Sequence, residues 1–363
     1  MGITCALGAD AETVARRLDA KDASGMKLLE GLAGGESTFL GFAEGMPRPG
    51  RIDERRFVPG GIPRVDALVD AAMSQIADAL DAAKAEFGAD RIGAVVGTSN
   101  STMEEFTDNP DTIDMSHPAG RIRDRWGVTG PCWSVSTACS SSAKAFASAR
   151  RLLDDDICDA VVVGGADAYT RAVVEGFHSL EALSQGLACP LAADRDGINL
   201  GEGAAFFLML RDAPPAEGDS LAVRLVGVGE SSDAYHMTAP DPEGRGAEAA
   251  MREALAEAGL SPGEIDFINL HGTGTRQNDD MECSAVRRLF GGAEPSADAS
   301  PAEGLAVRAF STKGLTGHCL GAAGAVEAAL CWLELRKRPA TCLSNSFAFG
   351  GSNASVVLSS RPI

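Results

Sequence analysis

Basic residues are scarce in this chain. It has 32 lysines and arginines against 51 aspartates and glutamates, which gives a formal net charge of −19. A charge of this sign and size argues against nucleic acid and anionic membrane surfaces as main partners, because both repel an acidic protein. Any acidic partner would have to dock on a local basic patch.

Three further absences narrow the class of protein. No apolar run approaches the length that is needed to cross a membrane. The nine cysteines are an odd number and show neither a C-x-x-C pair nor the spacing of zinc ligands, which excludes a structural zinc protein. No secretory signal pattern opens the sequence. We therefore expect a cytoplasmic protein with free thiols.

Strand and helix patterns alternate along the chain. Short apolar runs predict buried strands at 91–97, 159–165, 204–210, 221–228, 265–270 and 354–358. Stretches with helical spacing of apolar residues lie between them, including 65–87 and 322–333. The segment 26–63 is rich in Gly, Pro and charge and is expected to be mostly loop. This alternation predicts a layered α/β architecture.

The alternation of predicted strands and helices starts again after a linker-like segment. Residues 212–220 (DAPPAEGDS) resemble a linker, and strand and helix patterns start again beyond it. We expect two similar halves, residues 1–215 and residues 216–363.

Cys139 stands where a run of β-branched and small residues gives way to a helical pattern. A helix start offers free backbone N–H groups and the positive end of the helix dipole, and both stabilise a thiolate. The same N–H groups could hold an oxyanion. The alternative is a buried structural cysteine, since free cysteine is among the most buried residue types.

Histidine is also sparse, with five in the chain, and two of them adjoin glycine-rich turns. His271 follows a predicted strand, and His318 precedes a predicted helix, shortly after Lys313. Side chains at such points gather at the end of a sheet, where α/β proteins place their sites. We therefore expect Cys139, His271, Lys313 and His318 to meet.

A set of motifs in one order resembles the β-ketoacyl-acyl carrier protein synthases, the condensing enzymes of fatty-acid and type II polyketide synthesis. The ordered set is far more specific than any single motif. Details resemble the small synthase-like proteins of aryl-polyene pathways. The matching motifs are Thr137–Ser141 (TACSS), Arg195–Gly197 (RDG), Gly201–Ala204 (GEGA), His236–Pro240 (HMTAP), His271–Thr275 (HGTGT), Ser311–Lys313 (STK), Gly317–Glu327 (GHCLGAAGAVE) and Asn345–Asn353 (NSFAFGGSN).

The resemblance implies a thiolase-like layered αβαβα fold and a two-step reaction. Cys139 would take an acyl group from acyl carrier protein, and decarboxylation of malonyl-acyl carrier protein would supply an enolate that attacks it. Neutral His271 and His318 would donate hydrogen bonds to the enolate. Lys313 would disfavour a doubly protonated imidazole. No metal and no resident cofactor are expected, because the substrates arrive on phosphopantetheine.

Supporting roles follow from the same resemblance. The backbone N–H groups of Cys139 and Phe349 would form the oxyanion hole. A gating loop would contain Phe347, Phe349 and Gly350, although Phe347 could equally be a core residue. Glu327 would order Lys313 and a water network, with a helix-surface charge as the alternative. Hydrogen bonds to phosphopantetheine would come from Thr273 and Thr275.

The resemblance also implies partners. Acyl carrier protein is expected to dock on Arg64, with Arg123 or Arg125 as weaker candidates; the alternative for these two is a solvated surface with structural ion pairs. The family forms dimers, so we expect a homodimer or a heterodimer with a second ketosynthase-like subunit, and Thr98–Thr102 lies in the region that abuts the partner.

Two departures from the family pattern bear on the structure. The segment before Asn345 is shorter than usual, so a strand is expected to be missing there. Ala348 stands where glycine is usual in the gate, and alanine resists some conformations that glycine adopts.

Two other functions compete with the condensing enzyme. A chain-length-factor-like subunit of a ketosynthase heterodimer would typically lack the cysteine, which this chain keeps together with both histidines. A Cys-His hydrolase would have no use for two histidines and a lysine. We therefore predict a 3-oxoacyl-acyl carrier protein synthase.

Overall fold

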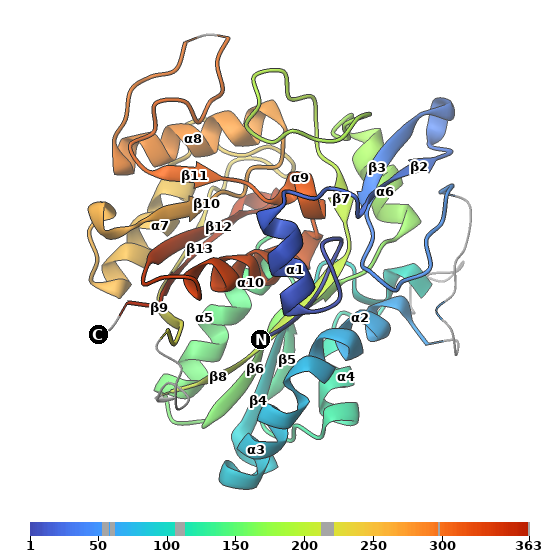
Figure 1. Ribbon diagram of the computed structural model, residues 1–363, viewed down its shortest axis with the longest axis vertical. Helices are drawn as coiled ribbons and strands as arrows, with labels where there is room; N and C mark the ends of the chain where they lie inside the picture. The colour runs from blue at the N-terminus through green and yellow to red at the C-terminus, as the bar shows by residue number, and fades with distance from the viewer. Residues whose placement is uncertain (53–57, 59–61, 106–112, 212–220, 297, 362–363) are drawn as a thin grey trace.

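The computed structural model describes residues 1–52, 58, 62–105, 113–211, 221–296 and 298–361 (Figure 1). Each half of the chain contributes one five-stranded sheet. The first sheet contains, in spatial order, β1 (Gly2–Thr4), β8 (Gly203–Leu210), β6 (Ala160–Asp167), β4 (Ile92–Gly97) and β5 (Cys132–Val135). The second contains β9 (Arg224–Ser232), β13 (Ser352–Ser359), β12 (Thr341–Phe347), β10 (Phe267–Asn269) and β11 (Arg308–Phe310).

The two sheets have the same topology. In each, the spatial order is the first, fifth, fourth, second and third of these strands. The first two pairings are antiparallel and the last two are parallel. The expected likeness of the two halves is therefore confirmed at the level of the fold.

Two helices lie between the sheets. They are α5 (Ser141–Asp154), which follows β5, and α10 (Ala323–Leu335), which follows β11. α10 is apolar around nearly its whole circumference, as expected for a helix with sheet on both sides. Val95 of β4 packs in this central core, whereas its neighbours Ala94 and Val96 pack in a separate core on the other face of the sheet.

Outer helices complete a five-layer αβαβα arrangement (Figure 1). The first sheet is covered by α2 (Arg64–Met73), α3 (Ala77–Phe87) and α4 (His117–Trp126), and the second by α7 (Arg245–Ala258) and α8 (Arg276–Phe290). This is the thiolase-like fold that the sequence predicted. The remaining elements are α1 (Ala11–Asp19), α6 (Arg171–Ser179), α9 (Lys313–Thr316) and a small sheet of β2 (Met26–Glu30), β3 (Ser37–Gly41) and β7 (Leu200–Gly201).

One local expectation was wrong. The stretch 65–87 is not one helix, because a 3₁₀ turn at Ser74–Ile76 separates α2 from α3. The described residues of the segment 26–63 are mostly loop, as expected, with the β2–β3 hairpin as their main regular structure. Around Asn345, β12 begins at Thr341 and pairs with β10 and β13.

The expected linker, 212–220, lies outside the described residues, so the boundary between residues 215 and 216 stays a prediction. Within the described part of the chain, no helix combines the length and apolarity needed to span a membrane.

Candidate active site

Cys139 lies in a tight turn between β5 and α5. Ala138, just before it, adopts a left-handed backbone with φ of 51°, and α5 begins two residues after the cysteine. Buried serines hold this turn: the Ser141 hydroxyl accepts from the Thr137 N–H at 2.9 Å and donates to the Ala138 carbonyl at 2.5 Å. These short contacts explain why small hydroxyl residues follow the cysteine.

The surroundings of Cys139 keep its sulfur protonated. Burial raises the pKa of the thiol to about 12, although the Lys313 ammonium and the Phe349 backbone N–H act in the opposite direction. The expectation that the helix start would provide a ready thiolate is therefore corrected. Desolvation of the charged form outweighs the dipole, so the thiol needs a nearby base.

His318 is placed to be that base. Its Nε2 lies 2.9 Å from Cys139 Sγ, and the two residues come from opposite halves of the chain. Burial, helped by the charge of Lys313, holds the pKa of His318 well below its usual value, so the ring is neutral. Its Nδ1 is buried and has no hydrogen-bond partner in the described structure. Because the Cys139 thiol is protonated, it donates to Nε2 across this contact, and the proton of the neutral ring sits on Nδ1.

His271 lies beside His318 with a fixed tautomer. The ring centroids are 5.2 Å apart and the rings are nearly perpendicular. Lys313 Nζ lies 3.4 Å from His271 Nδ1, and an ammonium can only donate, so Nδ1 accepts and the proton sits on Nε2. Burial first and Lys313 second hold the pKa of His271 well below its usual value. His271 is thus a neutral donor.

Lys313 is enclosed by acceptors. Its ammonium donates to the His271 carbonyl oxygen at 2.6 Å and forms an ion pair with Glu327. Glu327 is buried on α10, so the alternative of a helix-surface charge is excluded. Burial raises the pKa of Glu327 to about 6, against the opposing effect of Lys313.

The cysteine and the two histidines could also hold a small cation, because one ligand atom from each lies within 4.8 Å of the others. Their neighbours disfavour it. A metal-ligating imidazole donates its other N–H to an acceptor. Here His271 Nδ1 faces an ammonium and His318 Nδ1 faces no acceptor. The arrangement suits proton transfer better than metal binding.

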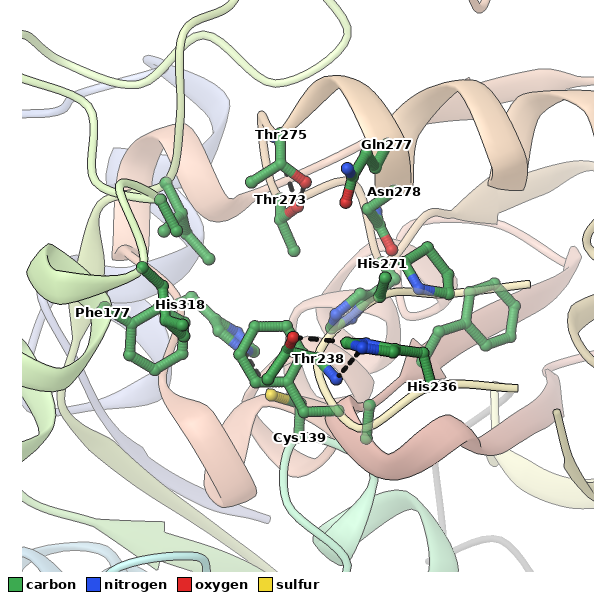
Figure 2. A pocket seen from close by; sticks show the side chains of 18 of the residues that line it. Cys139, Phe177, His236, Thr238, His271, Thr273, Thr275, Gln277, Asn278 and His318 are labelled. Atoms are coloured by element: carbon green, nitrogen blue, oxygen red, sulfur yellow. Dashed lines mark hydrogen bonds between the residues drawn. The ribbon is translucent and has the colours of Figure 1, made fainter. Parts of the chain in front are cut away.

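A cavity of about 390 Å³ leads to these residues (Figure 2). Figure 2 shows Cys139 on one side, with Thr273, Thr275 and Gln277 on the opposite side. The Thr273 and Thr275 hydroxyls lie 3.0 Å apart. The cavity is therefore shaped to pass a slender group from the start of α8 to the sulfur.

The expected gating loop lines the same cavity. Phe347 is buried, with its ring 6.2 Å from that of His271. Phe349 is partly exposed and stacks on Phe177 of α6 at 5.5 Å. Gly350 has φ of 81°, which favours glycine, whereas Ala348 is extended with φ of −116°. Alanine is thus unstrained at position 348 in this conformation.

The polar loop after β4 is buried around a carboxylate. Asp167 accepts from the Thr98 hydroxyl at 2.5 Å, from the N–H groups of Ser99 and Asn100, and from the Gly321 N–H at 2.6 Å. Gly321 lies three residues after His318, so this carboxylate joins the nucleophile half to the histidine half. Sequence reasoning missed Asp167 because its partners are about 70 and 154 residues away.

Arg64 does not fit the docking role. Its side chain is 1% exposed and forms a bidentate pair with buried Glu202, with both N–O distances at 2.6 Å. A guanidinium that is enclosed in this way cannot meet a partner protein. The expectation that Arg64 docks acyl carrier protein is therefore corrected.

The weaker docking candidates on α4 are exposed but paired. Arg123 Nε lies 2.7 Å from Asp124, and Arg125 Nε lies 3.0 Å from Asp70. Both match the alternative of structural ion pairs on a solvated surface.

Comparisons with known proteins agree with this geometry. The family model of the beta-ketoacyl synthase N-terminal domain matches residues 55–214, and that of the C-terminal domain matches residues 222–344. A 3-oxoacyl-[acyl-carrier-protein] synthase 2 of Coxiella burnetii is 31% identical, over 82% of this chain and 83% of the relative. A nodulation protein E of a Rhizobium species is 32% identical, over 93% and 85%.

Solved structures extend the likeness. A ketosynthase in complex with its chain length factor from Xenorhabdus doucetiae has a TM-score of 0.85 and 36% identity, over 99% of this chain and 96% of that one. A beta-ketoacyl synthase from Burkholderia phymatum has a TM-score of 0.78 and 26% identity, over 99% and 98%.

Proposed function

The chain belongs to the β-ketoacyl synthase family and is a condensing acyltransferase, and from this we propose how its own residues perform the condensation. Cys139 carries the acyl group, and malonyl-acyl carrier protein supplies the two-carbon unit. The product is a 3-oxoacyl-acyl carrier protein. The observation that carries the proposal is the contact of Cys139 Sγ with His318 Nε2, next to a second imidazole whose Nε2 can only donate.

The first half-reaction transfers the acyl group. Sγ attacks the thioester carbon while its proton moves to His318 Nε2, because a thiol with a pKa of about 12 is a weak nucleophile. The backbone N–H groups of Cys139 and Phe349 receive the developing oxyanion. The carrier's thiolate then leaves and takes the proton from His318.

The second half-reaction forms the carbon–carbon bond. The malonyl thioester oxygen accepts hydrogen bonds from Nε2–H of His271 and of His318 as the bond to carbon dioxide breaks. The enolate carbon attacks the acyl-Cys139 carbonyl, and the Cys139 thiolate leaves and takes a proton from solvent. Once Cys139 is acylated, no thiol donates to His318 Nε2, so the ring proton can move from Nδ1, which has no partner in the described structure, to Nε2 and be donated in the second step.

Lys313 and Glu327 keep both imidazoles in their working state. The ammonium opposes protonation of either ring, and the carboxylate holds the ammonium in place. Thr273 and Thr275 would bind the phosphopantetheine arm, and Phe347, Phe349 and Gly350 would gate the nucleophile. No step of this proposal is assigned to a resident cofactor.

We also propose that the working unit is a heterodimer with a second ketosynthase-like subunit. The ketosynthase from Xenorhabdus doucetiae, which is 36% identical, is in complex with its chain length factor. This chain would be the catalytic member, because it keeps Cys139 and both histidines.

Two variants test the division of labour between the histidines. His271→Ala should still be acylated on Cys139 but should lose about 10²–10³-fold in condensation, as expected for one oxyanion donor. His318→Ala should also be acylated about 10²-fold more slowly, since it loses the base. Intact-protein mass spectrometry reports the adduct, and the surface variant His178→Ala serves as the matched control. Acylation that fails in His271→Ala and persists in His318→Ala would reverse the assignment.

A further inference from the structure

We propose that the acyl carrier protein docks on a ring of exposed apolar side chains around the cavity, rather than on a basic patch. This surface, which we call the apolar rim, consists of Leu180, Tyr235, Met237 and Phe349. The inference rests on the proposed function, because it presupposes a carrier-bound thioester that must reach Cys139.

The apolar rim concentrates exposed apolar side chains around the cavity. Eight large hydrophobic side chains are exposed among the described residues, and half of them belong to the rim. Leu180 and Phe349 line the cavity themselves. Tyr235 and Met237 are the sequence neighbours of His236, which lines the cavity, and Met237 is 76% exposed. Exposed apolar side chains that cluster at a cavity mark an interaction site, whereas scattered ones do not.

The rim is held on ordered backbone. The Gly350 N–H donates to the Met237 carbonyl at 2.7 Å, and the Asp233 N–H donates to the Gly351 carbonyl at 2.8 Å. Asn353 Nδ2 adds a bond to the Asp233 carboxylate at 2.7 Å. The segment of Tyr235 and Met237 is thereby fixed to the loop of Phe349. The backbone that carries these side chains is therefore already ordered, which lowers the entropic cost of binding.

Charge disfavours a basic docking patch. The carrier is acidic and this chain has a net charge of −19, so the two repel at long range. Arg64 is enclosed by Glu202, and Arg123 and Arg125 are paired with aspartates. Arg276, exposed beside Thr275, is a cation next to the cavity, but one exposed charge contributes little. Burial of apolar surface supplies binding free energy that needs no charge on this chain and can offset this repulsion.

The position of the apolar rim indicates that acyl carrier protein, rather than another subunit, binds there. Two of its members line the cavity that ends at Cys139. A second subunit or a second copy seated there would cover the cavity and block the phosphopantetheine arm. The carrier is the partner whose arm must enter at this place.

The test compares a carrier-bound substrate with one that lacks the carrier. Met237→Ser and Tyr235→Ser should each raise KM for acyl-acyl carrier protein by about threefold to tenfold, as expected for interface anchors. Acylation of Cys139 by the N-acetylcysteamine thioester of the same acyl group should be unchanged. Ile157→Ser is the matched control: its side chain is similarly exposed, but it follows the far end of α5, about 20 Å from the start of that helix.

The dependence of KM on salt and a charge-reversal variant give the results that would contradict the proposal. KM for the carrier-bound substrate should stay the same or fall as salt is raised, because screening weakens the repulsion between the two acidic proteins and leaves the apolar contact in place. The proposal is overturned if Met237→Ser and Tyr235→Ser leave KM unchanged while Arg276→Glu raises it in a salt-dependent way. Equal loss with both substrates would assign the rim to the gate. A rim variant that changes the oligomeric state in light scattering would assign it to a subunit interface. In each case acylation of the wild type by the small thioester would leave the proposed function intact.

Discussion

Replacement of Arg64 should damage the fold rather than the encounter with a carrier protein. Its guanidinium forms two hydrogen bonds with Glu202 and a third, of 2.8 Å, with the Pro47 carbonyl. Glu202 is fully buried and also accepts from the N–H groups of Ala43 and Tyr169. Arg64→Met would leave this carboxylate buried with two backbone donors and no countercharge.

The magnitude follows from that burial. Breaking a buried ion pair by removing one partner costs about 3–5 kcal/mol, because an uncompensated charge remains. Glu202→Gln should cost a similar amount, since it leaves the guanidinium uncompensated. The double variant should be less destabilised than the sum of the two, because neither charge is left. Arg123→Met is the control: its pair with Asp124 is more than half exposed and should contribute little to stability.

The assay is urea unfolding followed by circular dichroism at one fixed protein concentration, since association shifts apparent stability. A double-mutant cycle on Arg64 and Glu202 then gives their coupling free energy. The reasoning is refuted if Arg64→Met unfolds at the wild-type urea concentration and instead raises KM for the acyl carrier in a salt-dependent way. That result would show that Arg64 belongs to the surface that binds acyl carrier protein.

Two further predictions concern pH. Because burial raises the pKa of Cys139 to about 12, its alkylation by iodoacetamide should rise steadily from pH 6 to pH 9; a plateau with a midpoint below pH 8 would show a free thiolate instead. Glu327 has a pKa raised to about 6, so it gains a proton and its ion pair with Lys313 weakens as the pH falls through that value. The condensation rate should therefore fall on the acid side with a midpoint near pH 6, and Glu327→Gln should abolish that limb; an unchanged limb in the variant would assign it to another group.

The layered fold and the catalytic groups could be predicted because their signals are local. Cys139 and His318 each stand at the start of a small-residue helix, and His271 follows a strand. Each of these positions is visible within about ten residues of sequence. The shared fold then brings them together, because α5 and α10 occupy corresponding places between two sheets of the same topology.

The errors came from interactions that no local pattern carries. Arg64 looks like a surface residue at a helix start, and its partner Glu202 is 138 residues away. Asp167 ends an apolar strand, and only the folded chain shows that hydrogen-bond donors from two loops converge on it. The state of Cys139 was misjudged for the same reason. The helix start is visible in sequence, whereas the burial that outweighs it depends on the second half of the chain.

Single-turnover condensation tests the central claim most directly. The protein is loaded with a short acyl group, freed of excess donor, and mixed with malonyl-acyl carrier protein. The account predicts that the acyl adduct on Cys139 disappears at the rate at which a 3-oxoacyl-acyl carrier protein, two carbons longer, appears. An adduct that forms but only hydrolyses to the free acid would contradict it, as would a protein that accepts no acyl group at Cys139.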